Sequence, residues 1–121
     1  MWVVEFEPEF DAEYKLLPAN VRIELTAQAL VIEKFGPQAK RPRVDTLNGS
    51  KHANMKELRF DADGGVWRVA FAFDPKRNAI LLVAGDKSGT NEKKFYKQLI
   101  DTADARFDAH LERLRKLKDG K

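Results

Sequence analysis

The residues of this sequence that could perform chemistry are mainly cationic or aromatic. They lie in the second part of the chain and are Lys51, His52, Lys56, Arg59, Arg68, Lys87, Lys93, Lys94 and Tyr96. Cleavage of RNA without a metal needs a base for the proton of a 2′-hydroxyl, cations for the charge that grows on the phosphate, and an acid for the leaving 5′-oxygen. Arginine binds phosphate oxygens bidentately, and histidine titrates near neutral pH. The set therefore suits RNA cleavage, with His52 as a candidate base and Tyr96 or Lys87 as a candidate acid.

Other chemistries lack the residues that they need. The chain has no cysteine, which removes zinc ribbons, iron–sulfur clusters and thiol nucleophiles. Its two histidines, His52 and His110, are too few for a typical zinc site. Neither Ser50 nor Ser88 stands in a Gly-x-Ser-x-Gly elbow, and no glycine-rich phosphate loop is present. We expect no metal and no other cofactor.

Each candidate also has a purely structural interpretation. A single histidine in a polar loop is most often solvated, Arg59 could form a cross-strand ion pair, and Tyr96 could be packing beside the core. Lys93 and Lys94 are different, because the first turn of a helix favours anions over cations. Their position favours a functional role.

The charge of the chain is unevenly distributed. Up to Phe35 there are three basic and seven acidic residues, which leaves 19 basic and 12 acidic residues of the totals of 22 and 19. The first part is therefore −4 and the remainder +7, within a formal net charge of +3. A basic second part suggests an anionic partner, with RNA or DNA favoured over an acidic protein, although solubility alone is the simpler explanation.

The first part of the chain predicts a strand and a helical hairpin. Residues 2–6 read as a short strand, and residues 11–17 as a helix that Pro18 interrupts. A second helix ends at Gly36, and its apolar residues recur at helical spacing: Val21, Leu25, Ala29 and Ile32. A short connection makes the two helices antiparallel neighbours.

Residues 37–54 are polar and rich in turn-forming residues, which predicts a long surface loop. Three strands follow, over residues 55–60, 66–73 and 79–84. Their short connections predict an antiparallel β-meander.

Alternation along the middle strand assigns its side chains to two faces. Trp67, Phe71 and their neighbours of the same parity should pack on the helices, whereas Arg68 points the other way. Arg59 on the preceding strand should share the face of Arg68. Small alanines beside these arginines predict an open, positively charged groove above the sheet. The direction of Lys56, near the start of its strand, is left open.

A long final helix begins near Thr90 or Asn91. Its apolar stripe comprises Phe95, Leu99, Ala103, Phe107, Leu111, Leu114 and Leu117. Its last turns could extend past the domain and contact a partner, or its first half could simply pack on the sheet. We expect one α+β domain over residues 1–121, with the order β-α-α-β-β-β-α.

Nothing in the sequence indicates export or insertion into a membrane. The longest apolar run is far below the roughly 20 residues that a span requires. The first residues alternate apolar side chains with Glu and lack a basic leader, so a cytoplasmic location is expected.

The order of elements and four segments together resemble the RelE/ParE superfamily of bacterial toxins, and most closely its HigB-type, phage-derived branch. The segments are KELRF, GVWRVAFAFD, LLVAGDKSG and KKFYK. The resemblance spans nearly the whole chain. It implies the toxin of a type II toxin–antitoxin system that cleaves mRNA on the ribosome and so inhibits translation, without a metal.

The resemblance also implies roles for individual residues. Arg59 and Arg68 match the arginines that bind phosphate and stabilise the transition state. Lys87 occupies the basic position after the last strand, and Tyr96 matches the aromatic residue that contacts the substrate. The candidates for proton transfer are Lys56 and His52, and those for RNA binding are Lys40, Arg41, Arg43, Lys51, Lys93 and Lys94.

The sequence departs from the RelE pattern at two points. Glu57 stands where some RelE members carry a lysine, and the final helix is longer than RelE requires. The longer helix keeps open a ParE-like toxin that inhibits DNA gyrase without nuclease activity. A non-enzymatic RNA-binding module, which needs no chemistry, is the second alternative. The implied partners are the ribosome, mRNA and a cognate antitoxin with a DNA-binding helix-turn-helix, which would cover the basic groove or wrap the helical hairpin. No membrane partner is implied.

Overall fold

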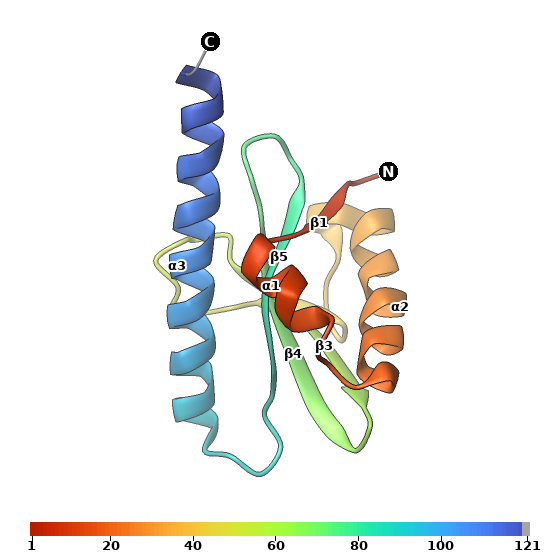
Figure 1. Cartoon of the computed structure of the whole chain (residues 1–121). Helices are drawn as coiled ribbons and strands as arrows, with labels where there is room; N and C mark the ends of the chain where they lie inside the picture. The colour runs from red at the N-terminus through yellow and green to blue at the C-terminus, as the bar shows by residue number, and fades with distance from the viewer. Residues whose placement is uncertain (120–121) are drawn as a thin grey trace.

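A five-stranded mixed sheet separates two layers of helices in the computed structural model, which describes residues 1–119 (Figure 1). The elements in chain order are β1 (Val4–Phe6), α1 (Pro8–Tyr14), α2 (Ala19–Phe35), a 3-10 turn (Gly36–Gln38), β2 (Val44–Thr46), β3 (Lys56–Ala62), β4 (Gly65–Phe73), β5 (Ala79–Asp86) and α3 (Glu92–Asp119). The strand order is β1-β5-β4-β3-β2. Strands β3, β4 and β5 form the expected antiparallel meander, and β1 pairs in parallel with β5. The predicted α+β fold is confirmed.

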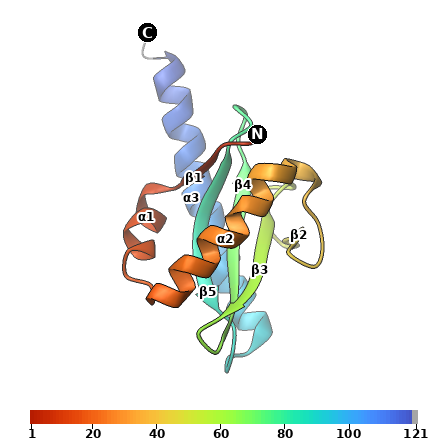
Figure 2. The same cartoon turned by 90° about the vertical axis from the view of Figure 1, so that its right-hand side faces the viewer.

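One face of the sheet packs against α1 and α2, as strand alternation predicts. Val21, Leu25 and Ile32 of α2 are fully buried against Leu58 and Phe71 of the sheet. Figure 2 shows α2 lying across this face, with α3 behind the sheet. The apolar stripe of α2 therefore supplies the core on this side.

The opposite face of the sheet is covered by the first half of α3. Leu99, Ala103 and Phe107 of this helix are buried against β4 and β5, where Ala70 and Ala72 leave room for them. The expectation of an open groove on this face is wrong, because the space above the alanines is filled by α3 and not by solvent. The simpler interpretation of the first half of α3, packing on the sheet, is confirmed.

A β-bulge in β5 strengthens this second layer. Ala70 pairs with Val83 and Phe71 pairs with Leu81, so Leu82 is the extra residue of β5. Leu82 and Val83 consequently both contribute to the cluster under α3, which strict alternation would forbid.

The long loop predicted over residues 37–54 is only partly a loop. Residues 44–46 form β2, an edge strand antiparallel to β3, and Val44, Leu47 and Met55 are buried. Three strand residues are too few for alternation to reveal, and burial of Val44 against the α2 side holds them in place.

The predicted bounds of the first helix also differ from those observed. Helix α1 begins at Pro8 and ends at Tyr14. Its start is set by the Glu7 side chain, which caps the helix by accepting a hydrogen bond of 2.9 Å from the backbone nitrogen of Phe10. Helix α2 begins directly after Pro18 and its last residue is Phe35, so Gly36 stops it as predicted. None of the helices within residues 1–119 combines the length and the apolar character that crossing a bilayer requires.

Candidate active site

Three polar side chains meet between the sheet and the first turns of α3. The Tyr96 hydroxyl donates a hydrogen bond of 2.7 Å to Glu57 Oε1, and Arg68 Nε donates one of 3.3 Å to the Tyr96 oxygen. Arg68 Nε also lies 3.6 Å from Glu57 Oε1. Arg68 and Glu57 are only 5% and 6% exposed, so both ionic groups are largely removed from water. We call Glu57, Arg68 and Tyr96 the central cluster.

The surroundings of Tyr96 keep its phenol protonated. Burial, which disfavours the phenolate, raises the pKa of Tyr96 above its ordinary value, and the hydrogen bond to Glu57 acts in the same direction. The hydrogen bond from Arg68 opposes both effects without reversing the shift. At neutral pH the phenol is therefore protonated, and its proton lies in the hydrogen bond to Glu57.

Lys87 lies beside the central cluster, directly after β5. Its Nζ is 5.5 Å from the centroid of the Tyr96 ring and forms an ion pair of 3.0 Å with Glu92. The Lys87 backbone nitrogen donates to the carbonyl of Val66 over 2.8 Å, which fixes the start of this loop to β4. Its side chain is 22% exposed, so the ammonium is accessible from solvent.

Arg59 contributes a second guanidinium to the same face of the sheet. It is the direct cross-strand partner of Arg68, as strand alternation predicts, and it is half-buried. Its backbone nitrogen donates to the carbonyl of Arg43 over 2.7 Å. Together with Arg41, its charge contributes to lowering the pKa of Asp45. Arg59 is therefore the more accessible of the two paired arginines.

A glycine allows α3 to approach the sheet closely at this point. A Cβ atom on Gly85 would lie 2.9 Å from Cε1 of Phe95, closer than side chains tolerate. Because Gly85 pairs with Arg68 across the strands, the first turn of α3 settles directly over the central cluster. The residue after Phe95 is Tyr96, whose hydroxyl is thereby placed on Arg68.

Glu57 is the residue of this site that the sequence analysis missed. The sequence draws attention to Glu57 only because some RelE members have a lysine at this position. In the structure its carboxylate accepts the hydrogen bond of Tyr96 and lies against Arg68. The signal was available, since Glu57, Arg59 and Arg68 have the parity that places them on one face of adjacent strands.

The structure does not bring Lys56 to the central cluster. Its register partner is Phe71, which packs on the α2 side of the sheet, and it lines a surface hollow with Lys40 and Arg41. The Lys56 side chain, whose direction the sequence left open, therefore lies on the opposite face of the sheet from Glu57.

His52 is also separate from the central cluster. Its Nε2 lies 2.8 Å from Asp108 Oδ1, and its ring packs edge-on against Phe107 at 4.9 Å. Asp108 is about three turns beyond Tyr96 on α3, a rise of about 18 Å. Lys51 forms an ion pair with the same carboxylate, and it is the main cause of the lowered pKa of Asp108, followed by His52.

The remaining RNA-binding candidates form two groups. Lys93 and Lys94 are exposed in the first turn of α3, directly after Glu92, the ion-pair partner of Lys87. Lys40, Arg41 and Arg43 are exposed ahead of β2, where Arg41 forms a salt bridge of 2.9 Å with Asp45. Across residues 1–119, no group of three or more His, Asp or Glu side chains is arranged to hold a metal ion.

Comparison with known proteins places most of the chain in one family. Residues 12–108 match the model of the phage-derived Gp49-like proteins. The chain is 41% identical over 99 residues to a Mycobacterium tuberculosis protein named as the toxin HigB3, covering 82% of the chain and 84% of that relative. It is 48% identical over 82 residues to one named as the toxin HigB2 of the same organism. That match covers 67% of the chain and only 40% of the relative. No solved structure matches the chain.

Proposed function

The chain belongs to the Gp49-like family of phage-derived proteins, and we propose that it is the toxin of a type II toxin–antitoxin system that cleaves mRNA on the ribosome. The observation that carries this proposal is the meeting of an acceptor, a protonated donor and a cation within 3.6 Å of one another, namely Glu57, Tyr96 and Arg68. Two further cations lie beside them: Lys87, whose Nζ is 5.5 Å from the centroid of the Tyr96 ring, and Arg59, the cross-strand partner of Arg68.

The proposed reaction is a phosphoryl transfer within the RNA, from the 5′-oxygen to the neighbouring 2′-oxygen. The 2′-oxygen attacks the adjacent phosphorus, the bond from phosphorus to the 5′-oxygen breaks, and the products are a 2′,3′-cyclic phosphate and a 5′-hydroxyl. The proton of the 2′-hydroxyl passes to a base, and the leaving 5′-oxygen receives a proton from an acid. Cations stabilise the charge on the phosphate in between.

Each part of this reaction has a candidate in the site. Glu57 accepts the proton, and Tyr96, whose pKa is raised chiefly by burial, donates one to the leaving oxygen. Arg59 and Lys87 are accessible enough to contact the phosphate. Arg68 is buried and acts first as a positioning residue, because it holds the Tyr96 hydroxyl and lies against Glu57.

Binding of the RNA backbone falls to the exposed cations around the site. Lys93 and Lys94 extend the positive surface of Lys87, and Arg43 extends that of Arg59. The other cationic candidates, Lys40, Arg41 and Lys51, lie farther out and already serve in part as partners of acidic side chains. Lys56 and His52 would take part only if the substrate reached beyond the central cluster.

Inhibition of DNA gyrase is the second candidate function. It is favoured by α3, a helix of 28 residues whose end carries the exposed Leu117. It is also favoured by the burial of Arg68, which an enzyme that must contact phosphate would be expected to expose.

One experiment separates the two candidates. The chain is expressed from a tightly controlled promoter, mRNA 5′ ends are mapped by primer extension, and plasmid supercoiling is followed in the same cells. We expect new cuts within codons that vanish from a reporter message whose start codon is removed. Intact messages with impaired supercoiling would replace the nuclease proposal with gyrase inhibition.

Matched lysine variants connect the cuts to the site. Lys87→Ala should reduce cleavage at least tenfold, because it removes a cation near the phosphate. Lys15→Ala removes an exposed lysine that is paired with Asp11 on α1, and it should leave the cuts unchanged. Equal cleavage by the two variants would contradict the placement of the site.

A further inference from the structure

Helix α3 extends well beyond the sheet on which it packs. Its 28 residues span about 42 Å, whereas the nine residues of β4 span about 30 Å. The last polar contacts of α3 with the rest of the described chain join His110 Nε2 to Asp74 Oδ2 at 2.8 Å and Arg113 Nη2 to Glu7 Oε2 at 3.9 Å. Figure 1 shows the C-terminal turns of α3 standing clear of the strands.

The apolar stripe of α3 continues past these contacts. Leu111 is still partly packed on the buried residues between α3 and the sheet, Leu114 is half-buried, and Leu117 is 69% exposed. The spacing of three residues keeps all three on one side of the helix. Exposure of leucine side chains to water is unfavourable in free energy, so this stripe indicates a surface that a binding partner covers.

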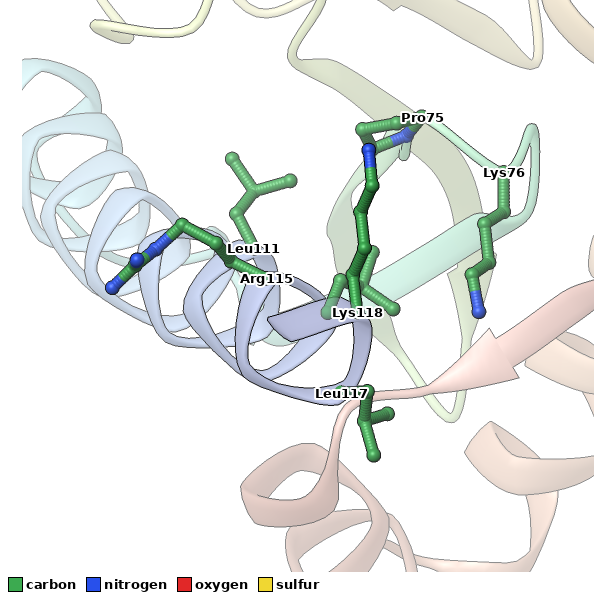
Figure 3. Close-up of a pocket in the computed structure, with 7 residues that line it drawn as sticks. Pro75, Lys76, Leu111, Arg115, Leu117 and Lys118 are labelled. Carbon is green, nitrogen blue, oxygen red and sulfur yellow. The ribbon is translucent and has the colours of Figure 1, made fainter. Parts of the chain in front are cut away.

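These leucines line a groove together with the β4–β5 turn. The turn contributes Pro75 and Lys76, and α3 contributes Leu111, Leu114 and Leu117 with the cations next to them. The hollow has a volume of about 690 Å³, within the range of about 300–1,000 Å³ that is usual for binding pockets. Figure 3 shows the helix on one side of the hollow and the turn on the other.

The rim of this groove is strongly basic. Arg115 is paired with carboxylates of its own helix, but no carboxylate within residues 1–119 forms an ion pair with Lys76, Lys116 or Lys118. Cations in the last turn of a helix are favoured by the helix dipole, which accounts for Lys116 and Lys118. The dipole accounts neither for the three leucines of the stripe nor for Lys76 across the groove.

We propose that this groove is the docking site for an acidic amphipathic helix of the cognate antitoxin, an inference that rests on the proposed toxin function. Leucines at helical spacing suit the apolar face of a partner helix, and the free lysines suit its acidic residues. RNA would engage the cations but leave the leucines exposed. A second copy of the chain would bring an equally positive surface against this one.

The location of the groove determines the kind of inhibition. Leu114 lies about 27 Å along α3 from Tyr96, so a helix docked there leaves the central cluster uncovered. The groove is therefore an anchor that holds the antitoxin on the toxin, and it is distinct from the residues that we propose for RNA cleavage. A variant in the groove should escape the antitoxin while remaining fully toxic.

The test compares two equally exposed apolar residues. Leu117→Asp alters the groove, and Ile23→Asp alters the outer face of α2, where the side chain is 68% exposed. Neither side chain is buried, so both variants should fold, which far-UV circular dichroism checks. The affinity of each for the purified protein encoded beside this chain is measured by calorimetry. We expect Leu117→Asp to weaken binding at least tenfold, because it removes an apolar contact and repels an acidic helix, and Ile23→Asp to change it by less than twofold.

Every other result overturns the proposal. Unchanged affinity of Leu117→Asp, an equal loss at Ile23, or failure of the unmodified chain to bind the neighbouring protein would each exclude the antitoxin from this groove. Conversion of a dimer to a monomer by Leu117→Asp would assign the groove to a second copy. Cleavage of mRNA by the free chain is measured separately, so failure of the nuclease proposal remains distinguishable from failure of the docking proposal.

Discussion

Replacement of Tyr96 by phenylalanine tests the central cluster most directly, because it removes one oxygen that makes two hydrogen bonds. The bond of 2.7 Å goes to a carboxylate, and hydrogen bonds to charged groups contribute about 1.5–3 kcal/mol each. The bond of 3.3 Å from Arg68 is long and adds little. We therefore expect Tyr96→Phe to lower the free energy of unfolding by about 1.5–3 kcal/mol.

The effect on cleavage should be larger than the effect on stability. Loss of a general acid typically slows a reaction by about 10²–10⁴-fold, and a domain that keeps most of its stability remains folded at 25 °C. We expect Tyr96→Phe to reduce translation-dependent cleavage at least 100-fold, as measured by primer extension at matched protein levels. Urea denaturation of the same purified variant gives the stability.

Tyr14 provides the matched control. Its hydroxyl also makes two hydrogen bonds, at 2.8 Å to Thr26 and 3.3 Å to the carbonyl of Arg22, but it lies on the far side of the sheet. Both partners are uncharged, so Tyr14→Phe should cost about 0.5–1.5 kcal/mol and leave cleavage unchanged. Full cleavage by Tyr96→Phe, or an equal loss by Tyr14→Phe, would refute the assignment of Tyr96.

Two further predictions concern proton transfer and pH. Glu57→Gln should reduce cleavage about 100-fold because it removes the proposed acceptor, whereas His52→Ala should change it less than threefold; the opposite ranking in the primer-extension assay would move the base to His52. Glu13→Gln should lower the free energy of unfolding by about 1 kcal/mol at pH 7. Arg106 donates two hydrogen bonds, of 2.7 and 2.6 Å, to the half-exposed Glu13 carboxylate. These bonds lower the pKa of Glu13 below its ordinary 4.5. A carboxyl with a lowered pKa stabilises the fold above its unfolded pKa and loses this contribution as pH falls through its folded pKa, so urea denaturation should show the difference shrinking below pH 4.5. A difference that does not shrink as pH falls below 4.5 would contradict the ion pair.

Much of the fold was predictable because its signals are local. The stripe of α2 and the short turns of the meander follow from residue spacing, and the pairing of Arg59 with Arg68 follows from alternation. Strand β2 was not predictable, since three residues carry too little pattern and Val44 is held by contacts with distant elements. The bulge at Leu82 likewise depends on the helix that packs over it.

The site was harder to predict than the fold because its geometry depends on the position at which α3 packs against the sheet. Parity places Glu57 beside the arginines, but only the approach of Phe95 over Gly85 brings the Tyr96 hydroxyl onto both. The position of His52 away from the central cluster also depends on how α3 packs. The α3 carboxylate that His52 meets, Asp108, lies far along the helix from Tyr96.

The burial of Arg68 constrains how a substrate could reach it. The middle of α3 is anchored by Phe107 in the core and by Arg106, which binds Glu13 and also donates to the carbonyl of Leu82 over 2.9 Å. The first turn is held less firmly, because Lys93 is exposed and the half-buried Tyr96 is held by its hydrogen bonds to Glu57 and Arg68 rather than by full burial in the core. Displacing the whole helix would expose an apolar face, whereas opening one turn exposes little. Access to Arg68 should therefore come from local opening of the first turn of α3, which hydrogen exchange would detect as faster exchange there than at Phe107.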